Sequence, residues 1–143
     1  MASYRWLTNS LDIEVIGPES LSGKYLSRAD WVKEGACDIL RAGVQGVGGL
    51  SPTLKVAALA EAFGMDCEIH GNGAPNLNVV GAIKNCRWYE RGLLHPFLDY
   101  EAPAAYLNSI IDPMDNDGFV HLPQRPGLGE DINVGWIEAH TQT

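Results

Sequence analysis

Four ionisable residues fall at or near the ends of short apolar runs, and their chemical types suit acid–base catalysis. Glu19 follows the first run, Asp38 lies in the second, His70 ends the third and Glu90 ends the fourth. A histidine beside an aspartate is a general base with a fixed tautomer, because the carboxylate holds one ring nitrogen while the other accepts a proton. A glutamate one strand further along can face the substrate. We therefore predict a proton-transfer site made from these residues.

Each of these residues also has a simpler interpretation when it is considered alone. An acid at a strand end is more often a solvated loop residue or a helix cap, and a histidine in a glycine-rich loop is often merely exposed. The occurrence of all four at matching positions in successive strands favours the functional interpretation.

Alternating strands and helices must position these side chains. The apolar patterns predict strands at residues 13–16, 37–41, 66–70 and 87–90. They predict helices at residues 3–11, 21–34, 52–63, 76–84 and 132–140, with Ser51 as the N-cap before Pro52. This alternation indicates βαβ units in a parallel sheet, and catalytic groups in parallel barrels lie at the C-terminal ends of the strands.

The strand–helix rhythm stops after Gly92. Residues 95–130 hold most of the prolines and are expected to be irregular, with a hairpin turn at Asp117 and Gly118. We therefore expect an α/β unit over residues 1–94 and an irregular C-terminal tail over residues 95–143.

Composition excludes several classes of function. The chain has 143 residues and a net charge of −8, and its ten basic residues form no run, so a nucleic-acid partner is not expected. Its apolar stretches are too short to span a membrane, and its first residues do not resemble a signal peptide. Cys37, Cys67 and Cys86 are well separated, which favours buried reduced thiols and a cytoplasmic location.

Around the four candidate site residues, Glu19, Asp38, His70 and Glu90, the sequence resembles the enolase superfamily. The order and spacing of its segments are similar to the last four barrel strands of the mandelate racemase and muconate lactonizing enzyme branch, especially the acid-sugar dehydratases. The segments that carry this resemblance are residues 13–19, 37–41 with 46–49, 68–71 and 88–91, followed by a tail segment at 125–129. The resemblance implies that the chain is the C-terminal half of a TIM-type (β/α) barrel.

The resemblance also implies a chemistry. In this family Mg²⁺ binds the carboxylate of the substrate, here a sugar acid, and a base removes the neighbouring α-proton. By position, Glu19 resembles a metal ligand, His70 the general acid/base and Asp38 its dyad partner. Glu90 resembles the acid that hydrogen-bonds the substrate carboxylate as it becomes an enediolate. Removal of such a weakly acidic proton requires concentrated positive charge and a hydrogen-bond donor, which stabilise the negative charge of the enediolate.

The sequence departs from the family before residue 13. The family's capping domain, its first four strands, two metal ligands and a catalytic lysine do not fit there, and Glu19 alone is not a metal site. We therefore expect this chain to be inactive by itself and to form a homo-oligomer or to join a complementary barrel half. The alternatives are a non-catalytic remnant and one subunit of a split barrel that needs a partner chain.

Overall fold

The computed structural model describes residues 1–20, 24–92 and 95–142. A three-stranded sheet lies at the centre, in the order β1 (Ile16–Gly17), β2 (Ile39–Ala42) and β3 (Cys67–Ile69). Both pairings are parallel, with Ile16 opposite Ile39 and Leu40 opposite Cys67. The prediction of an α/β fold with parallel strands is therefore confirmed.

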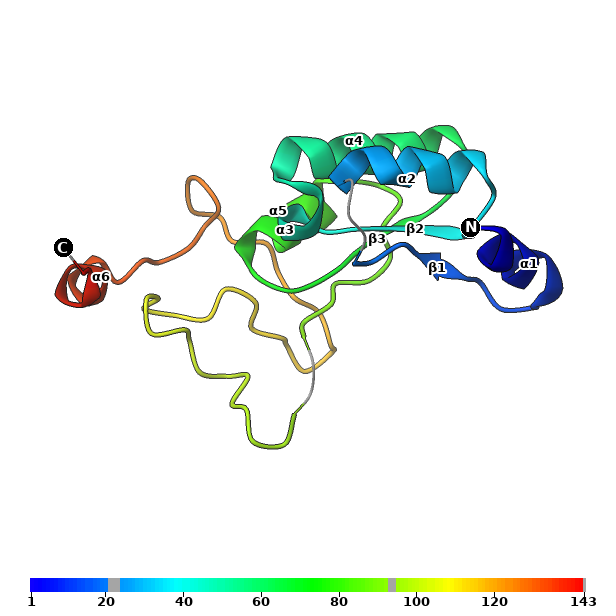
Figure 1. Ribbon diagram of the computed structural model, residues 1–143. Coiled ribbons are helices and arrows are strands. Elements are labelled where there is room, and N and C mark those ends of the chain that lie inside the picture. The colour runs from blue at the N-terminus through cyan, green and yellow to red at the C-terminus, as the bar shows by residue number, and fades with distance from the viewer. Residues whose placement is uncertain (21–23, 93–94, 143) are drawn as a thin grey trace.

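Helices alternate with these strands along the chain. In chain order they are α1 (Ala2–Ser10), α2 (Lys24–Lys33), α3 (Val44–Val47), α4 (Leu50–Ala62), α5 (Ala74–Ala82) and α6 (Val134–His140). Of these, α2 and α4 lie over one face of the sheet (Figure 1). The second helix was expected from residue 21, and residues 21–23 lie outside the described part of the chain. The expected domain boundary at 94 likewise falls on residues 93–94, which are not described.

The core lies between the sheet and the two long helices α2 and α4. Burial alternates along β2: Leu40 and Ala42 are buried, whereas Ile39 and Arg41 are partly exposed on the opposite face. Successive side chains of a strand point to opposite faces, so Leu40 and Ala42 pack towards the helices and Arg41 does not. Ile39 and Arg41 lie on the other face of the sheet, which we call the inner face. This face carries both polar and apolar side chains, and the described helices do not cover it.

The start of α4 differs from the prediction. Ser51 lies inside the helix, and the N-cap is Gly49, which has a φ of +125° and gives no side-chain cap. Glycine adopts this backbone conformation without strain, so the helix begins before the expected serine. The hydroxyl of Thr53 donates to the carbonyl of Gly49 at 2.7 Å within the first turn.

The fourth predicted strand, at residues 87–90, is not a strand in the structure. The segment approaches β3, because the N–H of Cys67 donates to the carbonyl of Asn85 at 2.6 Å. The N–H of Arg87, however, donates to the side chain of Glu68 at 2.9 Å. A buried carboxylate thus accepts the hydrogen bond that a regular ladder would direct to a backbone carbonyl, and the ladder does not continue.

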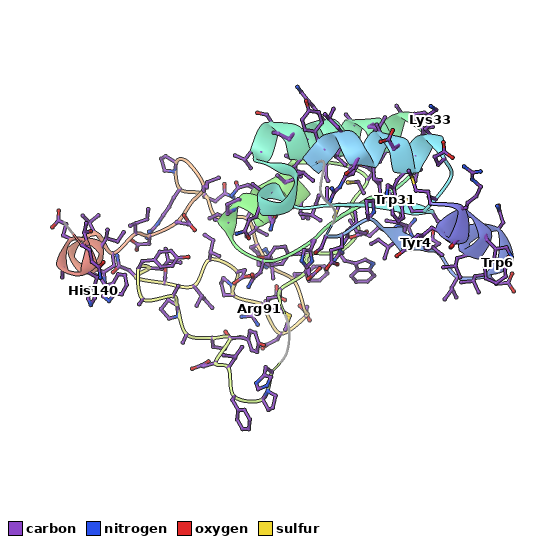
Figure 2. The ribbon with its side chains drawn as sticks, viewed as in Figure 1. Tyr4, Trp6, Trp31, Lys33, Arg91 and His140 are labelled. Carbon is purple, nitrogen blue, oxygen red and sulfur yellow. The ribbon has the colours of Figure 1, made fainter. Side chains whose placement is uncertain are left out.

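The C-terminal tail is irregular, as predicted, and runs beside the uncovered side of the sheet before it ends in α6 (Figure 1). The expected turn at Asp117 and Gly118 is confirmed: the N–H of Gly118 donates to Asp115, and Met114 pairs antiparallel with Val120. At the other end of the chain, α1 packs on α2 through the rings of Tyr4 and Trp31, whose centroids are 4.6 Å apart (Figure 2).

Candidate active site

Three of the four predicted site residues gather around one arginine at the C-terminal ends of the strands. Glu19 lies two residues after β1, and His70 directly follows β3. The Nδ1 atom of His70 lies 3.1 Å from Oε1 of Glu90 and 3.6 Å from Oε2 of Glu19. For Glu19 and His70 this arrangement follows from the parallel sheet, which brings successive strand ends to the same edge. Glu90 reaches the same edge from the segment after β3, which is not a strand.

Arg41, on the inner face of β2, is the centre of this group. Its Nη2 atom forms a close ion pair with Glu90, lies 3.4 Å from Oε2 of Glu19 and lies 3.1 Å from Nδ1 of His70. Its Nε atom is buried without a hydrogen-bond partner. Sequence reasoning did not select Arg41, although a basic residue at an inward position of a predicted strand was a usable signal.

The pKa of Glu90 reflects these neighbours. Partial burial of the carboxyl group acts to raise its pKa, but the positive charge of Arg41 and the hydrogen bond with His70 together lower it below its ordinary value. Glu90 is therefore ionised at neutral pH and can only accept hydrogen bonds.

The predicted contact between Asp38 and His70 is wrong. Asp38 precedes β2, at the opposite end of the sheet, and its carboxylate accepts a hydrogen bond from the N–H of Val15 at 2.7 Å. Beside His70, β2 instead ends in Ala42, whose carbonyl accepts from the N–H of His70, and Gly43 follows the strand. A Cβ atom on Gly43 would lie 2.6 Å from the carbonyl oxygen of His70, so no side chain fits there. Strand β2 therefore offers His70 no carboxylate.

A buried arginine of α2 holds the backbone that carries Glu19. Arg28 is only 1% exposed, and it donates to the carbonyls of Glu19 at 2.8 Å and of Pro18 at 3.3 Å. It also donates to the carbonyl of Arg41 at 3.4 Å. Burial lowers the pKa of this guanidinium below its ordinary value. Arg28 thus links the loop after β1 to the strand that carries Arg41.

Asn76 and Tyr89 hold the backbone around His70. The amide of Asn76 accepts from the N–H of Val44 at 2.9 Å and donates to the carbonyl of His70 at 3.1 Å. The hydroxyl of Tyr89 accepts from the N–H of Gly73 and donates to Asp112 at 2.6 Å. Desolvation and the hydrogen bond to Asp112 raise the pKa of Tyr89. The loop that follows His70 is therefore attached both to α5 and to the tail.

Two hollows lie beside the candidate site. One, of about 340 Å³, lies at the strand ends and is lined by residues that include Glu19, Arg28, His70 and Asn76. The other, of about 560 Å³, lies over the inner face of the sheet, and Arg41 and Glu90 are part of its wall together with exposed apolar side chains. A small polar ligand at the strand ends would meet His70.

The fold agrees with the comparison to known proteins. The sequence model of the family described as "Enolase C-terminal domain-like" matches residues 1–136. The chain belongs to this family.

Several enolase-type proteins are similar to this chain over most of its length. The crystal structure of D-glucarate dehydratase from Agrobacterium tumefaciens complexed with magnesium is 64% identical, with a TM-score of 0.93 over 96% of this chain and 36% of that chain. The L-talarate dehydratase from Polaromonas sp. JS666, complexed with Mg and L-glucarate, is 26% identical, with a TM-score of 0.76 over 98% of this chain and 36% of that one. A D-gluconate dehydratase from Thermoproteus tenax is 29% identical over 141 residues.

This enolase-type chain spans only part of those proteins. The match to the Thermoproteus protein includes 96% of this chain but only 27% of that protein. The matches to the two solved structures each include 36% of the solved chain. No helix in the described part of the chain is both long and apolar enough to cross a membrane.

The described residues do not fit a magnesium ion on their own, although enolase-type relatives bind it. Within residues 1–20, 24–92 and 95–142, no group of three or more His, Cys, Asp or Glu side chains is arranged to hold a metal. Mg²⁺ prefers near-octahedral oxygen coordination, usually with more than one carboxylate when no phosphate is present. Glu19 offers one half-exposed carboxylate, and the guanidinium of Arg41 lies 3.4 Å from it. A complete metal site would need ligands from other polypeptide segments.

Proposed function

We propose that this chain supplies the acid–base part of an acid-sugar dehydratase, with a glucarate-like sugar acid as the substrate class. The observation that carries this proposal is the position of His70 at the strand ends, in contact with Glu90, Arg41 and Glu19. The 64% identity with D-glucarate dehydratase from Agrobacterium tumefaciens supports dehydration in preference to racemisation.

His70 would carry out both proton transfers of this reaction. It takes the proton from the carbon next to the substrate carboxylate, and the electron pair of that C–H bond then forms the carbon–carbon double bond. The hydroxyl group on the adjacent carbon leaves, and His70 returns the proton to it, so that water is released. A single histidine can serve as base and then as acid because it changes charge near neutral pH.

Glu19 would take part in metal binding only when other ligands join it. Its carboxylate lies on the same rim as His70, and Arg28 fixes its backbone. The residues described here supply no further ligand set, so we assign no step of the reaction to a metal on this chain.

A second candidate function is that of a non-catalytic partner in a split barrel. The inner face of the sheet favours it, because Ile16 and Trp88 are exposed there at 43% and 74%. In the described part of the chain, β1 and β3 each pair with a single neighbouring strand. Unpaired edges and exposed apolar faces commonly associate with other polypeptides, which here would be a second copy of the chain or a complementary barrel half.

A graft into the Agrobacterium enzyme tests the catalytic proposal. This chain would replace the matching 36% of that D-glucarate dehydratase, which is feasible at a TM-score of 0.93. The chimera should dehydrate D-glucarate in the presence of Mg²⁺, and His70→Asn should abolish that activity while the protein remains folded.

The matched control is His121→Asn, which changes an exposed histidine of the tail and should leave the chimera active. A folded chimera that converts neither D-glucarate nor other aldarates and aldonates would contradict the catalytic proposal. It would leave the split-barrel function as the better account.

A further inference from the structure

The Nδ1 atom of His70 has two competing neighbours. Both oxygens of Glu90 lie close to it, at 3.1 Å and 3.3 Å, and Nη2 of Arg41 lies at 3.1 Å. In a neutral imidazole Nδ1 can donate to the carboxylate or accept from the guanidinium, but it cannot do both. The neighbour that wins determines which ring nitrogen carries the proton.

The hydrogens of Arg41 Nη2 have stronger acceptors than an imidazole nitrogen. One is directed to Glu90, with which Arg41 forms a close ion pair, and Glu19 lies 3.4 Å from the same nitrogen. Charge-assisted hydrogen bonds to carboxylates are about twice as strong as neutral ones. Nη2 carries two hydrogens and has two carboxylates beside it, so Nδ1 of His70 is left with Glu90 as its acceptor.

We propose that Glu90 is a positioning residue that fixes His70 with its proton on Nδ1, leaving Nε2 as the basic nitrogen. Glu90 thereby takes the part that the sequence led us to expect of Asp38, and Arg41 holds Glu90 in place. This inference rests on the proposed function of His70 as the base for its meaning in catalysis. The tautomer itself is a property of this chain alone.

The same geometry changes the role expected of Glu90 itself. A residue that hydrogen-bonds a developing enediolate must donate a proton, but a carboxylate paired with Arg41 is an acceptor only. The lowered pKa of Glu90 agrees with this. The donor to the substrate carboxylate must then be a different group.

The proton position can be measured on the intact chain by ¹⁵N NMR of the imidazole rings, at a pH where His70 is neutral. The two ring nitrogens have well-separated shifts that depend on which of them is protonated. We expect the wild-type His70 to show the Nδ1–H tautomer. In Glu90→Ala the population should shift towards Nε2–H, because Arg41 then becomes the main partner of Nδ1.

Glu19→Gln is the matched control, because Glu19 is the other carboxylate near the same nitrogen, at 3.6 Å. This variant should keep the Nδ1–H tautomer. A wild-type spectrum with Nε2–H would overturn the inference by itself, even if Glu90→Ala did not fold. An unchanged tautomer in a folded Glu90→Ala variant would also overturn it. An inactive chimera whose His70 retains Nδ1–H would count against the proposed function but not against this inference.

Discussion

The carboxylate of Asp38 accepts a hydrogen bond from the backbone N–H of Val15 at 2.7 Å, and the carbonyl of Val15 accepts from the N–H of Asp38 at 2.8 Å. This reciprocal pair joins the residues that precede β1 and β2. It lies at the opposite end of the sheet from His70, so Asp38 stabilises the entry to the sheet and does not contact the candidate base.

Asp38→Ala should therefore destabilise the fold without disturbing His70. The lost acceptor leaves a partly buried N–H without its partner, which typically costs about 1 to 2 kcal/mol. Urea unfolding would measure this cost, and Asp38→Asn should lose less because its amide oxygen still accepts. A change in the His70 ring shifts in either folded variant would contradict this account and restore the predicted dyad.

Arg28→Met should destabilise the chain more strongly. Three buried or partly buried carbonyls, those of Pro18, Glu19 and Arg41, would lose a charged donor. Hydrogen bonds to charged groups contribute about 1.5 to 3 kcal/mol, so a loss of about 3 kcal/mol in the free energy of unfolding is expected. Faster amide exchange should appear near Glu19.

Arg5→Met makes the same substitution in a different setting. Arg5 pairs with Glu34, but both side chains are substantially exposed, and such pairs contribute less than about 1 kcal/mol. Equal losses from the two variants would show that Arg28 has no special part in holding the site.

The cysteines should be protected from thiol reagents as long as the chain is folded. Burial raises the pKa of Cys67 to about 12 and that of Cys37 to about 11, and the thiolate is the reactive form. At about pH 8 we expect both to react only after denaturation, as a thiol-counting assay would show. Rapid labelling of the native chain at Cys67 would contradict this.

The same shifts predict a fall in stability at alkaline pH. Above about pH 9 the unfolded chain loses thiol protons, whereas folded Cys67 keeps its proton until about pH 12. The free energy of unfolding should therefore decrease as pH rises through this window. Cys67→Ala should weaken the pH dependence, and an unchanged slope in that variant would exclude Cys67 as its source.

The sequence predicted those parts of the fold and of the candidate site that depend on the order of strands and helices, but not those that depend on the register between strands. The order of strands and helices, and the placing of Glu19 and His70 at one edge, followed from parallel topology, which fixes only the edge at which strands end. Glu90 lies at that edge although its segment is not the strand that was predicted. The assignment of Asp38 required the register between β2 and β3, and the register aligns Leu40 with Cys67. That pairing places Asp38 several residues away from the level of His70.

Another error came from a side chain that binds the backbone at long range. The fourth strand failed because Glu68 accepts from the N–H of Arg87, 19 residues later in the chain. Apolar patterning cannot reveal such a contact. Arg41 was different: its inward position in a predicted strand was visible in the sequence, but the predicted site contained only acids and a histidine.

Self-association through the uncovered sheet face should be measurable by sedimentation at micromolar concentration. Trp88 lines the hollow over this face and is 74% exposed, so Trp88→Glu should weaken association and reduce binding of a hydrophobic dye. Phe63→Glu changes a similarly exposed aromatic residue, 63% exposed after α4, and should have little effect. A wild-type monomer that binds no dye would contradict the prediction.

By itself, the chain should not exchange the α-proton of sugar acids at a useful rate. Stabilisation of developing negative charge is usually the largest catalytic contribution, and general acid–base assistance is worth only about 10² to 10⁴ in rate. Here the charge of Arg41 is already paired with Glu19 and Glu90, and the described residues contain no group of three or more His, Cys, Asp or Glu side chains that could hold a metal. A second copy of the chain would add the same residue types and no new ligand.

The assay is proton exchange in deuterated water with Mg²⁺ and a panel of aldonate and aldarate acids, with the grafted chimera as the positive control. Exchange by the chain alone should not exceed that of buffer. Exchange that His70→Asn abolishes, in a preparation free of any full-length enzyme, would contradict the prediction. It would mean that His70, with the charges around Arg41, suffices to remove an α-proton without the rest of the barrel.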